Sequence, residues 1–169
     1  MSAGLLLGRF QPLHDGHIFV LRQILKECGR AIVVIGSAQA SHDADNPFSA
    51  GERVEMLRAS LTKSELLRTT IIPIEDINRY PLWVAHLESR CPKFDRVYSR
   101  NPLTISLFKG ANYKVIEHDL YERGNCSGTE IRKRMAQGNP WKDCVPAGAR
   151  KVIEAIHGEE RVRALAGRK

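Results

Sequence analysis

The chain has 169 residues, of which 43% are hydrophobic and 27% are charged. This composition is typical of a soluble globular protein, and it excludes a disordered, collagen-like or coiled-coil chain. The 26 Lys and Arg residues exceed the 19 Asp and Glu residues, so the net charge is +7. That excess favours an anionic partner such as a nucleotide, a nucleic acid or a membrane surface, or it is simply a solvated basic surface. The length predicts one domain, 1–169.

The apolar runs and the cysteines indicate the cellular compartment in which we expect the protein. The longest apolar runs, Leu5–Leu7 and Ala31–Ile35, are far shorter than the ~20 residues of a membrane-spanning helix. The first residues lack the pattern of a signal peptide, so we expect a cytoplasmic protein without a membrane partner. Four cysteines are far apart in the sequence and form no CxxC motif: Cys28, Cys91, Cys126 and Cys144. This spacing argues against a zinc site, and in a cytoplasmic chain we expect four free thiols.

Segments with strand and helix patterns alternate along the chain. In chain order, the first half predicts a strand at Ala3–Gly8, a helix at His17–Cys28, a strand at Arg30–Gly36, a helix at Ser49–Leu61 and a strand at Thr69–Ile74. The second half predicts a helix at Pro81–Arg90, a strand at Phe94–Ser99, a helix at Leu103–Lys109, a strand at Tyr113–Ile116, and helices at Ser127–Met135, Ala147–Ile156 and Glu159–Ala166. The polar segment 37–48 predicts a loop.

This alternation predicts an α/β fold in which helices wind on both faces of a parallel, Rossmann-like sheet. The helices after the last strand form a C-terminal helical part of the same domain at about 127–169. In a doubly wound sheet, ligands bind beyond the carboxyl ends of the strands, where the strand order reverses. The loops that follow the strands are therefore the segments in which we look for chemistry.

The loop after the first strand combines glycines, an arginine and two histidines. It reads GRFQPLHDGH from Gly8 to His17, and a helix follows it. Glycines allow backbone N–H groups to approach an anion, and the helix N-terminus adds the positive end of its dipole. His14 lies three residues before His17, so both imidazoles can donate hydrogen bonds to one phosphate chain. The loop therefore predicts a phosphate-binding site.

A second candidate phosphate site lies at the start of the helix predicted after residue 126. Ser127 and Thr129 offer hydroxyl groups beside the free N–H groups of a helix N-terminus, and Ser127 with Glu130 fits a capping box. Arg132 lies one turn later and supplies a forked cation that suits phosphate. In isolation, these residues are equally consistent with a well-capped helix. Together with the first loop, they predict two cradles for one extended polyphosphate.

HxGH at 14–17 and SxTxxR at 127–132 are signature motifs of the nucleotidylyltransferase superfamily, which the chain resembles. Further blocks are similar to those of archaeal nicotinamide-nucleotide adenylyltransferases: IGSAQASH at 35–42, NPFSAGER at 46–53, LWV at 82–84, FDRVYSRNPL at 94–103 and SGTEIRKRM at 127–135. The resemblance implies a nucleotidylyltransferase-type sheet. It also implies transfer of the adenylyl group of ATP to nicotinamide mononucleotide (NMN), which forms NAD and pyrophosphate in NAD biosynthesis. The resemblance also implies that the reaction uses Mg²⁺ or another divalent cation. It further implies a homo-oligomer, which is a hexamer in similar enzymes.

The resemblance also assigns roles to residues by their position in these motifs. Those implied to act in catalysis on the ATP phosphates are Arg9, His14, His17 and Arg132, with His17 first in stabilising the transition state. Those implied to bind ATP are Gly8, Arg9, Phe10, His14, Gly16, His17, Ser127, Thr129 and Arg132. Those implied to bind NMN are Arg53, Asp76, Trp83 and Asn101, the last in the loop that closes on the adenylate side. The resemblance assigns no residue as a metal ligand.

Trp83 and Asp76 also suit a nicotinamide ring on chemical grounds. An indole can stack on the flat, positively charged pyridinium with a cation–π energy of ~0.5–2 kcal/mol. A carboxylate nearby would favour the cation or accept a hydrogen bond from its carboxamide. Without the resemblance, Trp83 is better interpreted as a core aromatic residue on a helix. Arg100 stands where similar enzymes have glycine and the segment 78–81 is unusual, so the reaction type is better defined than the substrate preference.

Two alternatives stay open at this point. Other members of the superfamily transfer an adenylyl or cytidylyl group to phosphopantetheine or FMN, and they share the HxGH loop. A chain that keeps the fold as a non-catalytic nucleotide or nucleic-acid binder would explain the basic charge and the run Arg132–Arg134. The sequence has no recognisable RNA- or DNA-binding motif, so we expect small-molecule substrates and no nucleic-acid partner.

Overall fold

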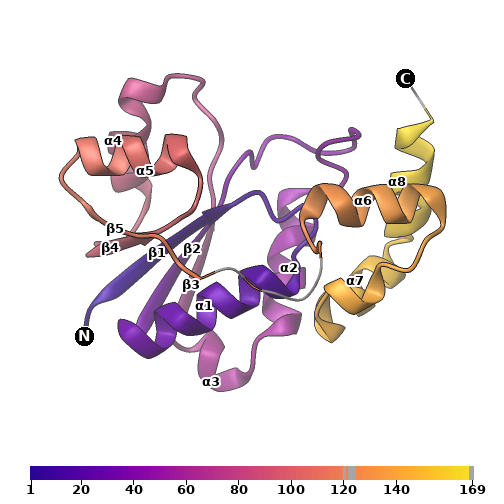
Figure 1. Ribbon diagram of the computed structural model, residues 1–169, viewed down its shortest axis with the longest axis horizontal. Helices are drawn as coiled ribbons and strands as arrows, with labels where there is room; N and C mark the ends of the chain where they lie inside the picture. Colours follow the sequence, from indigo (N-terminus) through magenta and orange to yellow (C-terminus); the bar gives the residue numbers. More distant parts are fainter. Residues whose placement is uncertain (120, 122–124, 168–169) are drawn as a thin grey trace.

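The computed structural model of the chain describes residues 1–119, 121 and 125–167. Its centre is a five-stranded sheet of β1 (Ala3–Gly8), β2 (Arg30–Ile35), β3 (Thr69–Pro73), β4 (Arg96–Tyr98) and β5 (Lys114–Ile116). All neighbouring strands pair in parallel, in the order β3-β2-β1-β4-β5. After β3 the chain returns to the far side of β1, so the strand order reverses between β1 and β4 (Figure 1).

Helices cover both faces of the sheet. They are α1 (Asp15–Glu27), α2 (Ala50–Ser60), α3 (Lys63–Leu66), α4 (Tyr80–Arg90) and α5 (Pro102–Gly110). Side chains alternate between the two faces of each strand. Leu6 and Val33 therefore pack with α1 and α2 in one cluster, whereas Leu5 and Val34 pack with α4 and α5 in the other. Figure 1 shows the two layers on opposite sides of the strands. The predicted doubly wound α/β fold is confirmed.

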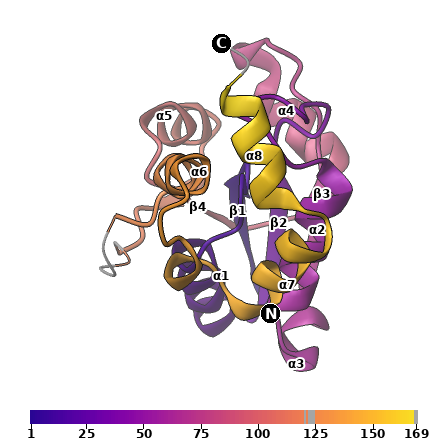
Figure 2. The same cartoon turned by 90° about the vertical axis from the view of Figure 1, so that its right-hand side faces the viewer.

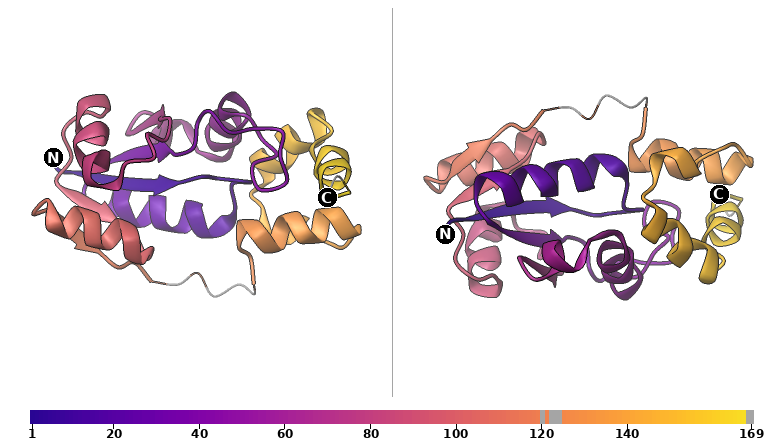
Figure 3. Two further views of the ribbon diagram at one scale, coloured as in Figure 1. Left: turned by 90° about the horizontal axis from the view of Figure 1, so that it is seen from above. Right: turned by 90° about the horizontal axis from the view of Figure 1, so that it is seen from below.

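The C-terminal part lies beyond the carboxyl ends of the strands (Figure 2, Figure 3). It consists of α6 (Gly128–Gln137), the 3-10 helix η1 (Lys142–Cys144), α7 (Ala147–Ala155) and α8 (Gly158–Ala166). α7 packs on α2 at Gly148, where an added Cβ would lie 1.9 Å from the carbonyl oxygen of Ala59. Glycine is thus required for the two helices to approach this closely. The start of α6 lies beside the loop that follows β1, where Gly128 approaches the carbonyl of Gln11.

The sequence-based predictions place the larger elements within a few residues of their positions, but they do not include α3 or η1. The expectation of four free thiols is wrong. Cys126 and Cys144 form a disulfide, because η1 folds back beside the N-terminus of α6 and brings their Cα atoms to 5.3 Å. Cys28 and Cys91 are free. Within the described ranges, no helix has both the length and the apolar character to span a membrane.

Candidate active site

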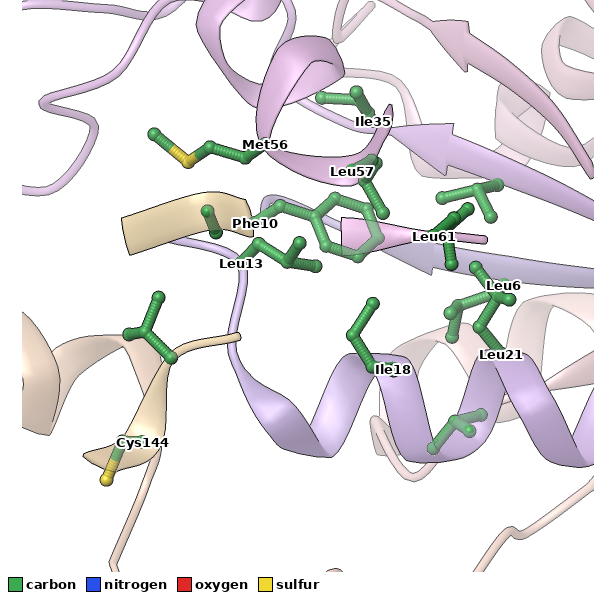
Figure 4. Close-up of a cluster of buried hydrophobic side chains, with 14 of the residues drawn as sticks. Leu6, Phe10, Leu13, Ile18, Leu21, Ile35, Met56, Leu57, Leu61 and Cys144 are labelled. Carbon is green, nitrogen blue, oxygen red and sulfur yellow. The ribbon is translucent and has the colours of Figure 1, made fainter. Parts of the chain in front are cut away.

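The first loop, between β1 and α1, is anchored in the core. Phe10 has a φ of 54°, and its side chain is buried with Leu13 between α1 and α2 (Figure 4). Gln11 is also buried. Its side-chain amide donates to the carbonyl of Phe48 at 2.8 Å, and its side-chain oxygen accepts from the Phe48 N–H at 2.9 Å. These contacts fix the backbone from which the two histidines of the loop project.

The imidazoles of His14 and His17 lie together at the start of α1, where His14 is the N-cap residue. The backbone N–H of His14 donates to Nδ1 of His17 at 3.2 Å, so the neutral His17 ring carries its proton on Nε2. Nδ1 of His14 is buried and has no hydrogen-bond partner among the described residues. A buried polar atom without a partner is costly unless a ligand satisfies it. The pair is therefore suited to a ligand with hydrogen-bonding groups.

Burial keeps both histidines uncharged at neutral pH. It lowers the pKa of His14 to about 4. The pKa of His17 is well below its usual range, first because the ring is buried and then because His14 and His118 lie nearby. Neutral rings can pack against each other without charge repulsion and still donate hydrogen bonds. A polyanion bound here would raise both pKa values, because negative charge stabilises the protonated ring.

The second cradle contacts the first directly. Ser127 is the N-cap of α6, and its hydroxyl oxygen accepts a hydrogen bond from the backbone N–H of Glu130 at 3.2 Å. The N–H of Ser127 has no corresponding bond to the Glu130 side chain in the described contacts, so one half of the predicted capping box forms. Arg132 is buried and donates to the carbonyl of Gln11 at 2.7 Å. A Cβ on Gly128 would lie 3.1 Å from that same carbonyl. The two predicted phosphate motifs are therefore neighbours in space.

A cavity of about 410 Å³ opens at the strand-order reversal. Leu7 and Ser99 contribute to it from the ends of β1 and β4. Most of its remaining lining is polar and includes His14, Gly16, His17, Arg100, Asn101, His118, Asn125 and Ser127. The histidine pair and the N-terminus of α6 face one space. We call this space the histidine cavity.

A second cavity, of about 440 Å³, adjoins it between α4, α5 and the ends of β1 and β2. Trp83, half-buried on α4, and Asp76, after β3, both line it. The Asp76 carboxylate accepts from the Ser37 hydroxyl at 2.6 Å, which fixes its orientation. Leu7 and Asn101 line both cavities, so the two spaces meet there. We call the second space the tryptophan cavity.

Arg53 is fully buried below the loops after β1 and β2. Its five N–H groups donate to five backbone carbonyls, which belong to Arg9, Gly36, Ser37, Ala40 and Ser49. These bonds use the whole donor capacity of a guanidinium. Arg53 therefore connects three segments of the site and, in this arrangement, has no donor left for a ligand.

The structure brings most of the predicted site residues to the two cavities. The histidine cavity is lined by His14, Gly16, His17 and Ser127, the tryptophan cavity by Gly8, Arg9, Asp76 and Trp83, and both by Asn101. The predicted residues that line neither of these two cavities are Phe10, Arg53, Thr129 and Arg132. Phe10, Arg53 and Arg132 are buried in the supporting structure, whereas Thr129 is exposed in the first turn of α6.

Sequence reasoning missed three polar residues of the site. Gln11 lies within the GRFQPLHDGH block, and its position between two motif residues could have signalled a structural role. Ser37 directly follows β2, where the strand-end rule directs attention. His118 follows β5 by two residues and is subject to the same rule. The rule applied to every strand would therefore have found Ser37 and His118.

Comparisons with known proteins agree with this geometry. The chain matches the family model described as cytidylyltransferase-like over residues 5–134. It is 49% identical over 167 residues to the nicotinamide-nucleotide adenylyltransferase of Methanoculleus marisnigri, covering 99% of each chain. Relatives of the same name from Picrophilus torridus and Pyrococcus furiosus are 46% identical over 160 residues and 45% identical over 169 residues. The match to the Picrophilus torridus relative covers 95% of this chain and 95% of the relative. The match to the Pyrococcus furiosus relative covers 98% of this chain and 90% of the relative.

Solved structures share the fold. A bifunctional NMN adenylyltransferase/ADP ribose pyrophosphatase from Francisella tularensis, complexed with AMP and a manganese ion, gives a TM-score of 0.78 at 20% identity. The match covers 98% of this chain and 52% of that protein. NadR protein in complex with NAD and AMP-PNP gives 0.62 at 16% identity, covering 90% of this chain and 45% of the other. From its sequence matches, the chain belongs to the cytidylyltransferase-like family and, within it, to the nicotinamide-nucleotide adenylyltransferases.

Proposed function

We propose that this chain transfers the adenylyl group of ATP to NMN, forming NAD and pyrophosphate in NAD biosynthesis. The observation that carries this proposal is the junction of the two cavities at Leu7 and Asn101. The histidine cavity has the donors that suit ATP, and the tryptophan cavity has Asp76 and Trp83, which suit a nicotinamide ring. Two nucleotides that occupy the two cavities would meet through their phosphates at the junction, as the formation of a dinucleotide requires.

The reaction is a single displacement at phosphorus. An oxygen of the NMN 5′-phosphate forms a bond to the α-phosphorus of ATP, while the bond from that phosphorus to the bridging oxygen of the β-phosphate breaks. Pyrophosphate leaves with the electron pair of the broken bond. Because the nucleophile is already an anion, the step needs no covalent intermediate, and the protein contributes by positioning the reactants and stabilising negative charge.

The phosphate-facing residues take these two tasks. His17 lines the histidine cavity, and through Nε2–H it stabilises the charge that develops on the α-phosphate. His14, with its unpaired buried Nδ1, binds the same chain. Arg9, which lines the tryptophan cavity, supplies a cation for the phosphates at the junction. Ser127 and Thr129 at the N-terminus of α6 offer hydroxyl and backbone donors to the departing pyrophosphate.

Two buried arginines act mainly through the loops that they hold. Arg132 donates to the Gln11 carbonyl and so joins the two cradles, and its cationic charge favours the polyphosphate. Arg53 holds the carbonyls of Arg9 and Ser37, which lie at the tryptophan cavity. We therefore propose that Arg53 supports NMN binding as a positioning residue.

The tryptophan cavity binds NMN. Trp83 stacks on the nicotinamide ring, and the Asp76 carboxylate lies close to its positive charge or accepts from its carboxamide. The Ser37 hydroxyl holds that carboxylate in position. Asn101 lines both cavities, so its side-chain amide can contact the phosphate groups of either nucleotide.

We propose that Mg²⁺ or another divalent cation enters as part of the ATP complex. Among the described residues, no group of three or more His, Cys, Asp and Glu side chains is arranged to hold a metal ion. Mg²⁺ is commonly held by substrate phosphates and water, with few protein ligands. When bound, the cation neutralises phosphate charge.

We further propose, on the resemblance to archaeal enzymes, that the protein is a cytoplasmic homo-oligomer, with a hexamer as the expected state. Sedimentation equilibrium of the purified protein measures its mass directly. A monomeric mass across the micromolar concentration range would contradict this proposal without affecting the proposed reaction.

The reaction is tested by incubating the purified protein with ATP, Mg²⁺ and one acceptor at a time: NMN, phosphopantetheine or FMN. CTP replaces ATP in a parallel series. Pyrophosphate release is followed by a coupled assay, and the dinucleotide is identified by chromatography. We expect NAD and an equal amount of pyrophosphate with ATP and NMN. Pyrophosphate with another acceptor but not with NMN would contradict the proposal, and ATP binding without any turnover would favour the non-catalytic alternative.

A further inference from the structure

His118 is a third histidine of the histidine cavity and belongs to neither phosphate motif. It follows β5 (Lys114–Ile116) by two residues and lines the cavity together with His14 and His17. The residue is half-buried, and it lies close enough to His17 to contribute to the lowered pKa of that ring. His118 therefore faces the same bound nucleotide as the histidine pair.

Two hydrogen bonds fix the backbone and ring of His118. Arg100 donates from Nη1 to the His118 carbonyl at 2.9 Å. Nδ1 of the His118 ring lies 2.9 Å from the carbonyl oxygen of Asp119. A carbonyl oxygen can only accept, so Nδ1 carries the proton in this contact. Arg100, which sequence reasoning noted as unusual after the fourth strand, thus acts on the loop after the fifth.

The tautomer decides what His118 can recognise. With the proton on Nδ1, Nε2 of the neutral ring is a hydrogen-bond acceptor. His17 has the opposite hydrogen-bonding role, because its Nε2 carries a proton and donates. The phosphate oxygens of ATP only accept, so they match His17 and do not match a neutral His118. The donors of ATP are the ribose hydroxyls and the exocyclic amine of adenine.

We propose that His118 accepts a hydrogen bond through Nε2 from a donor group of the nucleoside half of ATP, and that Arg100 is its positioning residue. This inference rests on the proposed function. It distinguishes the part of the histidine cavity that recognises the nucleoside from the part that binds phosphates.

The test compares wild type, His118→Ala and His118→Gln at pH 8 with saturating NMN. The variable substrates are ATP, 2′-deoxy-ATP, 3′-deoxy-ATP and inosine triphosphate, which lacks the exocyclic amine. Loss of one hydrogen bond corresponds to about a fivefold effect. We expect His118→Ala to raise the KM for ATP by about that factor, with the KM for NMN unchanged. His118→Gln, which keeps an acceptor, recovers part of the loss.

The analogues identify the partner group. The analogue that lacks the group bonded to His118 should have a higher KM than ATP with the wild-type enzyme. For that analogue, His118→Ala should raise the KM no further. The other two analogues behave like ATP. His118→Ala that raises the KM equally for all four nucleotides, or that leaves the KM for ATP unchanged, overturns the proposal. In equilibrium binding, His118→Ala could weaken the affinity for ATP more than the affinity for AMP. That result would assign His118 to the phosphates, and it also overturns the proposal.

Arg100→Ala and a remote histidine complete the design. Arg100→Ala should raise the KM for ATP less than His118→Ala does, while the order of the analogues stays the same. His157→Asn is the matched control, because His157 begins α8 with a φ of 52° that asparagine tolerates, and it is outside both cavities. If wild type makes no NAD, the proposed function fails. Equilibrium dissociation constants of the same four nucleotides then still test His118.

Discussion

The imidazole rings of His14 and His17 are stacked, with 3.6 Å between their centroids and 24° between their planes. This geometry disfavours protonation of both rings at once, because two stacked cations at this distance would repel each other strongly. Burial enforces the neutral state by lowering both pKa values. The loop between β1 and α1 therefore holds its two imidazoles in an uncharged form at neutral pH.

This pair should make folding stability depend on pH. In the unfolded chain both histidines titrate near 6.5, whereas in the folded chain the pKa of His14 is about 4 and that of His17 is also well below 6.5. The unfolded state thus binds more protons as the pH falls below 6.5, and stability is lost progressively down to about pH 4.

Urea unfolding at pH 7.5 and pH 5.0 measures this loss in the free energy of unfolding. Each histidine costs roughly 1.4 kcal/mol for each pH unit below 6.5, so the loss should amount to about 2–4 kcal/mol. The carboxylates Glu52 and Glu65 have lowered pKa values and stay ionised over this range, so they do not contribute. The double variant His14→Asn/His17→Asn should have a flatter profile. An equally steep profile in that variant would assign the pH dependence elsewhere.

Replacing His17 should affect turnover far more than ATP binding. A donor that stabilises developing charge on a phosphate contributes ~10²–10³ in rate. We expect His17→Ala to lower kcat by that factor, with the dissociation constant of ATP changed much less. Single-turnover kinetics with labelled ATP separate the two quantities. Near-normal turnover in His17→Ala would remove this residue from the mechanism.

Trp83 should act on NMN binding alone. Stacking serves the ground state and the transition state alike, so its loss raises KM and leaves kcat nearly unchanged. Trp83→Ala should raise the KM for NMN by about two- to thirtyfold, the range that corresponds to the usual cation–π energies. Trp83→Phe keeps an aromatic face and should recover part of this. A large fall in kcat with unchanged KM would contradict the assignment.

Arg53 should be a stability residue whose loss also damages the site. Arg53→Lys keeps the charge but leaves several of the five buried carbonyls without a donor, each at a cost of about 1–3 kcal/mol. We expect a lower urea midpoint and a higher KM for NMN. Arg58→Lys, on the exposed face of the same helix, is the control. Unchanged stability together with a higher KM would instead indicate direct contact between Arg53 and NMN.

The disulfide between Cys126 and Cys144 should stabilise the C-terminal part. Closing a loop of this length contributes about 3 kcal/mol by restricting the unfolded chain. The double variant Cys126→Ser/Cys144→Ser should therefore unfold at a lower temperature, whereas Cys91→Ser should not. Thiol titration of the denatured protein should give two thiols without reductant and four with it. Four thiols in both conditions would show that the bond is absent from the purified protein.

The sequence predicted the parts of this protein that local patterns determine. Apolar periodicity located the strands and longer helices. The residue types of the loop at Gly8–His17 predict a phosphate site, and that site stays a prediction. That residues 1–169 form one domain stays a prediction.

What sequence reasoning missed depends on contacts between distant segments. Arg53, whose role in NMN binding stays a prediction, donates to backbone carbonyls of the loops after β1 and β2, and its position in the sequence does not indicate these contacts. The disulfide was unpredictable because the spacing of Cys126 and Cys144 says nothing about how α6 and η1 fold back. The tautomer of His118 likewise depends on a neighbouring carbonyl.

The close approach of Gly148 to Ala59 has a consequence for the chemistry. Any side chain at residue 148 would force α7 away from α2 by more than an ångström, because the carbonyl lies only 1.9 Å from the added carbon. α7 packs on α8 and α8 packs on α6, so the shift would pass to the helix that carries Ser127. A displacement of about 1 Å at reacting groups can lower a rate about a hundredfold. We therefore expect Gly148, which lines neither cavity, to set the spacing between the loop after β1 and the N-terminus of α6.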